Sequence, residues 1–370
     1  MSDRLPVPPS PSSTDPPARG TARRRLGVAV LTLAAAVAVL GGLKGLVEAD
    51  TLGAWVRPRE LRFVQAQLWV YWGCWLLWPV MGWLALGMRR AWRRSPQGGL
   101  RRKAFRAAGL GGRATVLAAT ACILWARFAE PHWLRVHETR LSSTCGVRVA
   151  LVSDIHLGIF GRTDDLARLV DRLNALDVDA VLVAGDWTIA PPHELAPLLA
   201  PLSRLRHPLL SVTGNHDEEA PGPPLTEALR QTLKSLGVEN MEARRRALGH
   251  CELVGLGDLS AGGTAQHLAS LAAHPSDVPA ERRVVLVHNP DAAFELPKDY
   301  AAWVLAGHIH GGQVRLPFVT DWMLDHMTFG QFRPGVRELP YTRVFVTSGV
   351  GMSNLPFRFG VPPVIDLLDL

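Results

Sequence analysis

The 370-residue chain is long enough for more than one structural unit, and its net charge of +7 is unevenly divided. Residues 1–140 hold 21 Lys and Arg against 7 Asp and Glu, whereas residues 141–370 hold 19 against 26. A nucleic-acid-binding domain needs a basic face on its folded part. Because residues 141–370 are acidic, we exclude nucleic acid as a partner. The 4 cysteines are too few for a disulfide framework.

The first 25 residues are expected to be a disordered, basic tail. Six prolines lie among Ser and Thr in residues 1–20, and Arg23–Arg25 add three adjacent positive charges. Such a segment buries too little apolar surface to offset the entropy of ordering it. Residues 26–140 are then expected to form a transmembrane region that precedes the folded domain.

Three apolar segments of this region are predicted to cross a membrane, over about residues 26–43, 66–88 and 110–129. The first contains no charge, and a helix of that length at about 1.5 Å per residue nearly crosses a hydrocarbon core of about 30 Å. The second is rich in Trp, which favours a span over a buried soluble helix. The third is uncharged only over Ala114–Ala126, so two spans remain an alternative to three.

The number of spans decides on which side of the membrane residues 141–370 lie. Arg23–Arg25 and the arginine-rich residues 89–106 should both be cytoplasmic under the positive-inside rule. Three spans then place the folded domain outside the cytoplasm, and two spans keep it inside. We expect a multi-pass protein of the cell membrane with an extracytoplasmic domain, so the lipid bilayer is an expected partner.

Residues 141–370 alternate short apolar runs with helical patterns, which predicts an α/β domain with a largely parallel sheet. Thr163–Leu176, for example, has apolar residues at helical spacing after an expected Thr N-cap and two Asp. The apolar runs are rich in Val and Leu and are bounded by Gly, Asp or Asn, as buried strands are. They cover residues 147–152, 180–184, 209–212, 284–287 and 303–306.

A short polar motif follows each of these runs directly, where the carboxyl ends of parallel strands place functional sites. Asp and His with an Asn carbonyl, and without Cys, suit divalent ions such as Mn, Fe or Zn. Seven candidate ligands are too many for one catalytic zinc and about right for two ions that share a carboxylate. The motifs are Asp154-Ile155-His156, Gly185-Asp186, Gly214-Asn215-His216-Asp217, His288-Asn289 and Gly307-His308-Ile309-His310.

This set resembles the pattern D-x-H, G-D, G-N-H-[DE], H and G-H-x-H of the calcineurin-like metallophosphoesterase superfamily, over roughly residues 145–370. The sequences around His156, His288 and His310 resemble a branch of membrane-associated bacterial phosphodiesterases that includes UDP-2,3-diacylglucosamine pyrophosphatases. The resemblance implies a four-layer αββα sandwich, with two mixed sheets between helices. It also implies a metal-dependent phosphoric ester hydrolase.

The resemblance further implies a role for each motif residue. His216 would be catalytic beside the phosphoryl group without binding metal, and Asp217 would orient His216. Two divalent ions would be the cofactors. The implied ligands are Asp154, His156 and His310 for the first ion, Asp186 as the bridge, and Asn215, His288 and His308 for the second ion.

The expected reaction is hydrolysis of a phosphodiester or pyrophosphate bond by a hydroxide that bridges the two ions. A lipid-linked phosphorylated substrate such as UDP-2,3-diacylglucosamine is favoured, which would place the chain in lipid metabolism. The alternatives are a broad-specificity extracytoplasmic phosphatase of metabolites or wall phosphates, and a non-catalytic metal-binding membrane scaffold.

The clue to the substrate is a set of large apolar residues after the last motif. They either pack as a small separate core under the loop or form an apolar surface that meets the bilayer or acyl chains. In the second case, Arg333 or Arg358 would meet a phosphate. The set comprises residues 316–319, 322–324, 327–329, Phe332 and 355–359.

Cys145 and Cys251 flank apolar strands and could meet across a sheet. Buried free thiols are nevertheless the expectation for a chain with so few cysteines. A disulfide between them would require an oxidising compartment, because cytosolic thiols are kept reduced.

Overall fold

The computed structural model describes residues 114–115, 118–158, 160–191, 194–218 and 225–370. The predicted tail, residues 1–25, and the first two predicted spans lie outside the described residues. Of the third predicted span, residues 114–115 and 118–129 are described. They are helical and end in η2 (Trp125–Ala129), which η3 (Glu130–His132) follows. Within the described part of the chain, no helix is both long and apolar enough to cross a membrane.

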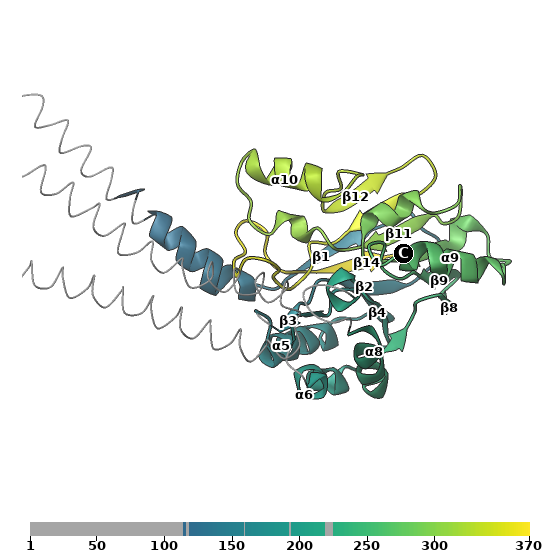
Figure 1. The fold of residues 1–370 in the computed structure, drawn as a ribbon, viewed down its shortest axis with the longest axis horizontal. Coiled ribbons are helices and arrows are strands. Elements are labelled where there is room, and N and C mark those ends of the chain that lie inside the picture. The colour runs from purple at the N-terminus through teal and green to yellow at the C-terminus, as the bar shows by residue number, and fades with distance from the viewer. Residues whose placement is uncertain (1–113, 116–117, 159, 192–193, 219–224) are drawn as a thin grey trace, which may run out of the picture.

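Two six-stranded mixed sheets form the centre of the domain (Figure 1). The first sheet, in spatial order, contains β1 (Arg135–Arg140), β14 (Val364–Asp369), β2 (Arg148–Val152), β4 (Ala180–Ala184), β6 (Leu209–Val212) and β7 (Glu239–Asn240). The second contains β12 (Gly335–Glu338), β13 (Arg343–Val346), β11 (Trp303–Ala306), β10 (Arg283–Leu286), β9 (Cys251–Gly255) and β8 (Arg244–Leu248).

Within each sheet, the strands that precede the polar motifs run parallel to one another. β2, β4 and β6 pair in parallel in the first sheet, as do β10 and β11 in the second. The antiparallel pairs are β14 with β2, β8 with β9 and β12 with β13. The predicted α/β class with mixed sheets is confirmed. β1 pairs with β14 over residues 135–140, so the first sheet begins upstream of residue 141, where we expected the domain to start.

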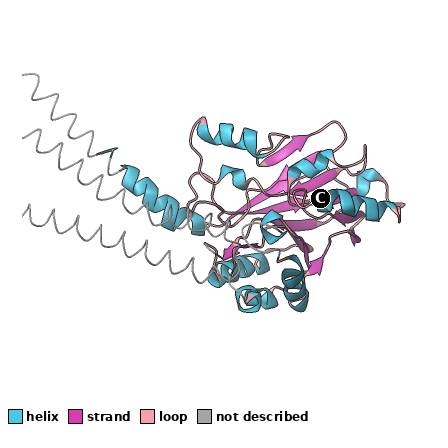
Figure 2. Ribbon diagram, viewed as in Figure 1, coloured by secondary structure: helices cyan, strands magenta, loops and turns pink. Residues whose placement is uncertain are grey.

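Helices cover the outer face of each sheet, as Figure 2 shows. On the first sheet they are α5 (Thr163–Asn174), α6 (Leu195–Leu199), η4 (Ala200–Arg204) and α8 (Thr226–Ser235). On the second they are α9 (Gly263–Ala272), η6 (Pro290–Phe294) and α10 (Val319–Met327). The short elements are the strand pair β3 (Leu157–Gly158) and β5 (Thr188–Ile189), with α7 (Asn215–Glu218), η5 (Ala280–Arg282) and η7 (His310–Gly312).

Three apolar cores hold these layers together, and alternation along each strand divides its side chains between two of them. In β4, Val181 and Val183 pack under the helices, whereas Leu182 packs between the two sheets. In β11, Leu305 faces the layer between the sheets and Val304 faces the helices beyond. Strands buried on both faces read as continuous apolar runs, which is the pattern the sequence shows.

Helix α5 confirms the predicted helix, with a shift at its start. Leu166, Leu169 and Leu173 are buried on one stripe, as the spacing predicts. The N-cap is Arg162 and not Thr163, because Asp165 accepts a hydrogen bond of 2.8 Å from the Arg162 backbone N–H. An acidic residue at the third helical position makes this contact whichever side chain occupies the cap.

The expectation of free thiols is wrong, because Cys145 and Cys251 form a disulfide. Cys145 lies shortly before β2 in the first sheet, and Cys251 begins β9 in the second. Both are buried in the core between the sheets, and their Cα atoms are 4.8 Å apart, within the range that a disulfide spans. They lie 106 positions apart in sequence, so only the packing of the two sheets brings them together.

Candidate metal centre

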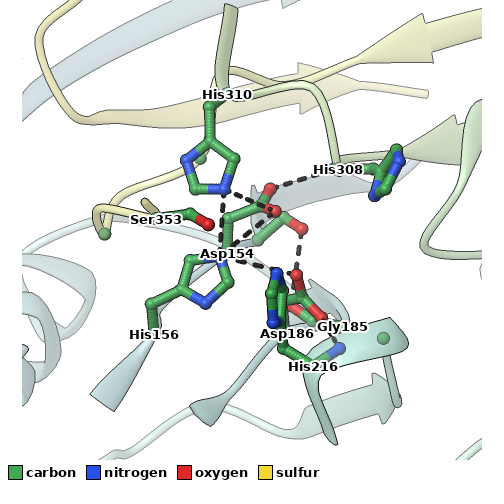
Figure 3. Close-up of polar contacts among 12 residues, drawn as sticks. Asp154, His156, Gly185, Asp186, His216, His308, His310 and Ser353 are labelled. Carbon is green, nitrogen blue, oxygen red and sulfur yellow. Dashed lines mark hydrogen bonds and ion pairs between the residues drawn. The ribbon is translucent and has the colours of Figure 1, made fainter. Parts of the chain in front are cut away.

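The five motifs meet where the carboxyl ends of the central strands of both sheets come together (Figure 3). Asp154 follows the end of β2 by two residues, and Asp186 follows β4 in the same way. Asn215 begins α7 after β6. His288 and His308 each lie two residues beyond their strands, β10 and β11, of the second sheet. The convergence expected from parallel strands is therefore present.

The first group of polar atoms contains Asp154, His156 and His310. The two histidine Nε2 atoms are 2.9 Å apart, and Asp154 Oδ1 lies 3.3 Å from His310 Nε2 and 3.9 Å from His156 Nε2. Figure 3 shows both rings directed toward the Asp154 carboxylate. Asp154 Oδ1 is buried and has no hydrogen-bond partner among the described residues. An unpaired buried carboxylate oxygen is costly unless a cation binds to it.

The second group contains Asn215, His288 and His308. Asn215 Oδ1 is 3.1 Å from His288 Nε2 and 3.1 Å from His308 Nδ1, and these two nitrogens are 3.2 Å apart. His288 Nδ1 donates a hydrogen bond of 2.7 Å to the Ala184 carbonyl oxygen. This bond holds the proton on Nδ1, so a neutral His288 turns the lone pair of Nε2 toward the group, as metal-binding histidines do.

Asp186 lies between the two groups. Its Oδ2 is 3.2 Å from His288 Nε2 in the second group and 3.4 Å from His156 Nε2 in the first. Its Oδ1 accepts a hydrogen bond of 3.0 Å from the His216 backbone N–H, which fixes the carboxylate plane. A single carboxylate oxygen that faces both groups is the arrangement that two ions sharing a ligand require.

The spacing of these atoms fits metal ions. Two ligands at right angles on an ion, each about 2.1 Å away, lie about 3 Å from one another. Most nitrogen–nitrogen and nitrogen–oxygen separations within the groups, 2.9–3.3 Å, are close to that value, and the separation of Asp154 Oδ1 from His156 Nε2, 3.9 Å, is longer. Three sets of side chains can each hold an ion, and one of them combines His216 with His156 and Asp186. The donor set of carboxylate, imidazole and amide oxygen suits Mn, Fe or Zn.

The electrostatics of the pocket favour positive charge. Burial raises the pKa of Asp186, but His288 and His216 outweigh it and hold that pKa well below its usual range. Burial lowers the pKa of His288, yet Asp186 raises it well above the ordinary value. Burial, together with the neighbouring His288, lowers the pKa of His308 to about 4. Asp186 is thus ionised and attracts a proton or a cation to its neighbours.

Five of the seven predicted ligands have a left-handed backbone conformation, with φ between 50° and 74°. Such a conformation costs about 1–3 kcal/mol for a residue other than Gly and persists where the surroundings enforce it, typically at functional sites. The surroundings of Asp154 are tightly packed. At Gly307 and Gly349, a Cβ would lie 2.7 Å from an atom of the Asp154 side chain. The five residues are Asp154, His156, Asp186, His308 and His310.

His216 and Asp217, the two predicted catalytic residues, lie on α7 beside the metal-binding groups. The His216 ring packs edge-on against His156, with centroids 5.1 Å apart. The Asp217 carboxylate accepts hydrogen bonds from the backbone N–H groups of Trp187 and Thr188, and from Gly214. Burial, and then Asp186, raise the pKa of Asp217 to about 7. These contacts hold the loops around Asp186, and the orientation of His216 by Asp217 stays a prediction.

Two residues near the site have roles that the sequence motifs did not indicate. Ser153 donates a 2.8 Å hydrogen bond to the Ala184 carbonyl, the same oxygen that accepts from His288. Arg358 is fully buried and donates to the carbonyls of Ser348, Gly351 and Val361. Its predicted contact with a phosphate is therefore wrong. Ser153 adjoins the first motif, but only the fold reveals the position of Arg358.

Arg333, the other predicted phosphate contact, pairs with Asp325 of α10 at 2.5 Å and donates to the Asp321 carbonyl at 3.2 Å. These partners belong to the helix that lies over the second sheet. They hold the Arg333 guanidinium against α10, and its contact with a phosphate stays a prediction.

Comparison with known proteins agrees with the site. Residues 147–312 match the family model of the calcineurin-like phosphoesterases. The chain is 27% identical over 267 residues to the uncharacterized metallophosphoesterase YkuE of Bacillus subtilis, an alignment that covers 66% of this chain and 88% of that protein. It is 26% identical over 273 residues to the phosphodiesterase YaeI of Escherichia coli, covering 70% and 96%.

A vertebrate relative shares only the domain. The chain is 29% identical over 232 residues to a transmembrane protein with metallophosphoesterase domain of Danio rerio, and this alignment covers 58% of the chain and half of that relative. The family match covers the strands and loops that carry all seven candidate ligands. The chain therefore contains a calcineurin-like metallophosphoesterase domain and is a metal-dependent phosphoester hydrolase.

Proposed function

We propose that the chain is a membrane-anchored phosphoesterase that uses two divalent ions to hydrolyse phosphodiester or pyrophosphate bonds of a lipid-linked substrate. The observation that carries the two-ion proposal is the position of Asp186 Oδ2, 3.2 Å from His288 Nε2 and 3.4 Å from His156 Nε2. A single-ion site has no need of a carboxylate between two separate donor groups.

The family resemblance implies how the ligands would be divided. Asp154, His156 and His310 would hold one ion, Asp186 would be shared, and Asn215, His288 and His308 would hold the other. When bound, the ions supply a nucleophile at neutral pH and neutralise charge on the phosphoryl oxygens. His216 stands beside this centre on α7, where its imidazole can steady the phosphoryl group or give a proton to the leaving oxygen.

The disulfide supports an extracytoplasmic location for the domain, which we place at about residues 141–370 together with β1. Cytosolic thiols are kept reduced, whereas disulfides persist in oxidising compartments. This location agrees with three predicted spans and the positive-inside rule. Relatives from Danio rerio and Bos taurus are named transmembrane proteins, which supports membrane anchoring.

An extracytoplasmic site changes the choice among substrates. A nucleotide-activated lipid precursor such as UDP-2,3-diacylglucosamine is made in the cytoplasm, so exported lipid-linked diesters are favoured over it. The relative from Escherichia coli is named a phosphodiesterase, which favours diesters over free monoesters. The identity of the ions is proposed only as Mn, Fe or Zn, from the donor set.

The test uses the full chain purified in detergent and supplied with Mn²⁺. We expect hydrolysis of bis-(p-nitrophenyl) phosphate that chelation abolishes. Asp186→Asn should lower the rate by more than about 100-fold. The loss of a residue that only hydrogen-bonds to a metal ligand typically costs about 10–100-fold, and the loss of a ligand itself should cost more. Asp164→Asn on the exposed face of α5 is the matched control and should leave the rate unchanged.

His216→Ala separates catalysis from metal binding. We expect it to lower the rate by about 10²–10⁴-fold, the usual contribution of acid–base catalysis, while the metal content measured by mass spectrometry stays at the wild-type value. A wild-type protein that binds metal and hydrolyses no diester on a broad panel would favour the scaffold alternative. A lower metal content in the His216→Ala variant would show that His216 is itself a metal ligand.

A further inference from the structure

Large apolar side chains are exposed on the segment that follows the last metal-site motif. Phe318 is 88% exposed and Phe329 is 96% exposed, an unusual state for a residue type that is mostly buried. Leu324 and Phe332 of this segment are buried, as the interpretation of a separate small core predicts. We call the exposed set the apolar lip: Leu316, Phe318, Val319, Trp322, Met327 and Phe329.

The first half of the apolar lip is tied to the loop of His310. Thr320 at the start of α10 donates a hydrogen bond of 2.7 Å to the Val314 carbonyl and accepts one of 2.7 Å from the Leu316 N–H. The same side chain packs on Gly312, where a Cβ would lie 2.5 Å from Thr320 Cγ2. Gly312 is two residues from His310. A large movement of α10 would therefore also displace the loop that carries His310.

The second half is tied to the loop of His288. The Asp291 carboxylate accepts hydrogen bonds of 2.8 Å from the backbone N–H groups of Phe329 and Gly330. Asp291 is buried and lies three residues after His288. Phe332 packs against Phe294 of the same loop, with ring centroids 6.0 Å apart. The exposure of Phe329 is therefore a property of a well-anchored loop.

A second exposed apolar surface lies where the helix of residues 118–129 enters the domain. Leu124, Trp125, Phe128 and Trp133 are between 38% and 48% exposed. Arg127 lies over the Phe128 ring and Arg135 over the Trp133 ring, at 5.1 and 4.5 Å from the centroids. Aromatic rings beside arginines are typical of the boundary between hydrocarbon and headgroups.

Backbone hydrogen bonds connect this surface to the apolar lip. The Arg358 N–H donates to the Ala126 carbonyl at 3.0 Å, and the Arg315 N–H donates to the Phe359 carbonyl at 2.7 Å. Because Arg358 and Phe359 are adjacent in sequence, these two bonds link Arg315, next to the lip, to the helix through two residues. In Figure 1, α10 also lies toward the end of the domain at which this helix enters.

We propose that the apolar lip rests on the surface of a lipid bilayer, on the side from which the chain enters the domain. This inference rests on the proposed function for its substrate. Residues 1–113, which precede the helix, contain two long uncharged apolar runs, so the chain reaches the domain from apolar segments that a bilayer would hold. Both the lip and the helix end expose large apolar side chains, as surfaces that meet a membrane do.

This placement explains how a lipid-linked phosphate would reach the metal centre. Both anchors of the lip belong to loops that carry predicted ligands, so contact with the bilayer sets the height of the site above the headgroups. A substrate could then present its phosphate while its acyl chains stay in the bilayer. The lip acts as a positioning surface, and none of its side chains needs to touch the reacting atoms.

The first test measures the environment of the lip directly. The full chain, with Cys74→Ser and Cys122→Ser and an intact disulfide, is spin-labelled at Phe318→Cys or Phe329→Cys and placed in nanodiscs of phosphatidylcholine and phosphatidylglycerol. We expect these labels to collide with oxygen and to be shielded from a water-soluble nickel chelate. A label at Tyr341→Cys, an exposed aromatic position of the β12–β13 turn, should remain accessible to the chelate.

Three outcomes would overturn the proposal. Lip labels as accessible to the chelate as the label at position 341 would show that no bilayer covers them. Dipolar broadening between lip labels of two molecules would place a second copy there. Shielding that develops only on addition of a short-chain lipid diester would place the acyl chain of one substrate on the lip, and not the bilayer.

The second test separates the lip from the metal centre. The triple variant Phe318→Ser/Trp322→Ser/Phe329→Ser should lose about tenfold or more of its rate on a lipid diester in vesicles, because interfacial binding scales with buried apolar area. Its rate on bis-(p-nitrophenyl) phosphate should stay at the wild-type value, and Tyr341→Ser should change neither rate. Equal losses on both substrates would overturn the lip. A wild-type chain inactive on both would refute the proposed function, while the label accessibilities would still decide the lip.

Discussion

The two sheets contribute different chemistry to the metal centre. The first sheet supplies both carboxylates among the predicted ligands, Asp154 and Asp186, and it also supplies the amide of Asn215. The second sheet supplies three histidines, His288, His308 and His310, and no carboxylate. His156 and Asn215 add donors without negative charge to the first sheet, so both carboxylates lie on one half and only histidines on the other. Each of the two ligand sets that the family resemblance implies combines residues of both sheets, so the packing of one sheet on the other brings each set together.

The largest effect should come from removing charge on the first half. Asp154→Asn should lower Mn²⁺ affinity and the diester rate by more than about 100-fold. This is a larger loss than removal of a residue that only hydrogen-bonds to a metal ligand typically causes. His308→Ala, which removes a neutral donor of the second half, should lower both by less. Calorimetry and steady-state rates on the full chain check this order. Equal losses for the two variants would show that the halves do not differ in the way their charges suggest.

An intermediate effect should come from loosening the two halves. The double variant Cys145→Ser/Cys251→Ser removes the disulfide between the sheets and should cost about 2–4 kcal/mol of unfolding free energy. Because the centre needs both sheets, Mn²⁺ affinity should fall together with stability. Cys122→Ser, at an exposed position, is the control and should change neither. A less stable protein with unchanged affinity would mean that packing alone aligns the sheets.

The smallest effect concerns a buried acid between the sheets. Burial raises the pKa of Asp366 to about 6, although Thr347 and His137 lower it. The folded state therefore favours the protonated form, so stability is greatest at low pH and is lost as the pH rises from about 4 through about 6. At pH 8, Asp366→Asn should raise the unfolding free energy by up to about 3 kcal/mol and so raise the melting temperature. At pH 4 it should leave the melting temperature nearly unchanged.

The melting temperature of the full chain at the two pH values checks this prediction, with Asp164→Asn on the exposed face of α5 as the control. A gain that is the same at both pH values would show that the effect arises from packing of the amide and not from the carboxylate charge. A loss at pH 8 would mean that the ionised Asp366 is stabilised by a contact that the raised pKa does not reflect.

Much of the site could be predicted because its signals are local. Each ligand motif follows a buried strand within two or three residues, so the strand pattern places the motif and the parallel arrangement brings the motifs together. The strands over residues 180–184, 209–212 and 303–306 have the predicted bounds. The resemblance to a known family added the division of ligands between two ions, which alternation and spacing do not indicate.

The predictions that were wrong all concern side chains whose surroundings are remote in sequence. Arg358 was expected to meet a phosphate but donates to three backbone carbonyls inside the fold. Cys145 and Cys251 were expected to be free, and the packing of two sheets pairs them. In each case an apolar or charged residue type suits two environments equally well.

The sequence by itself determined the α/β class, the order of the buried strands and the residue types that can bind metal. These depend on the periodicity of apolar residues and on the chemistry of side chains next to them, both of which act over a few positions. Only the tertiary structure decided that Asp186 lies between two donor groups, that five predicted ligands adopt left-handed backbone, and which aromatic residues of the last loop remain exposed. Those features depend on how two sheets and their loops pack, and packing is the sum of contacts between residues far apart in the chain.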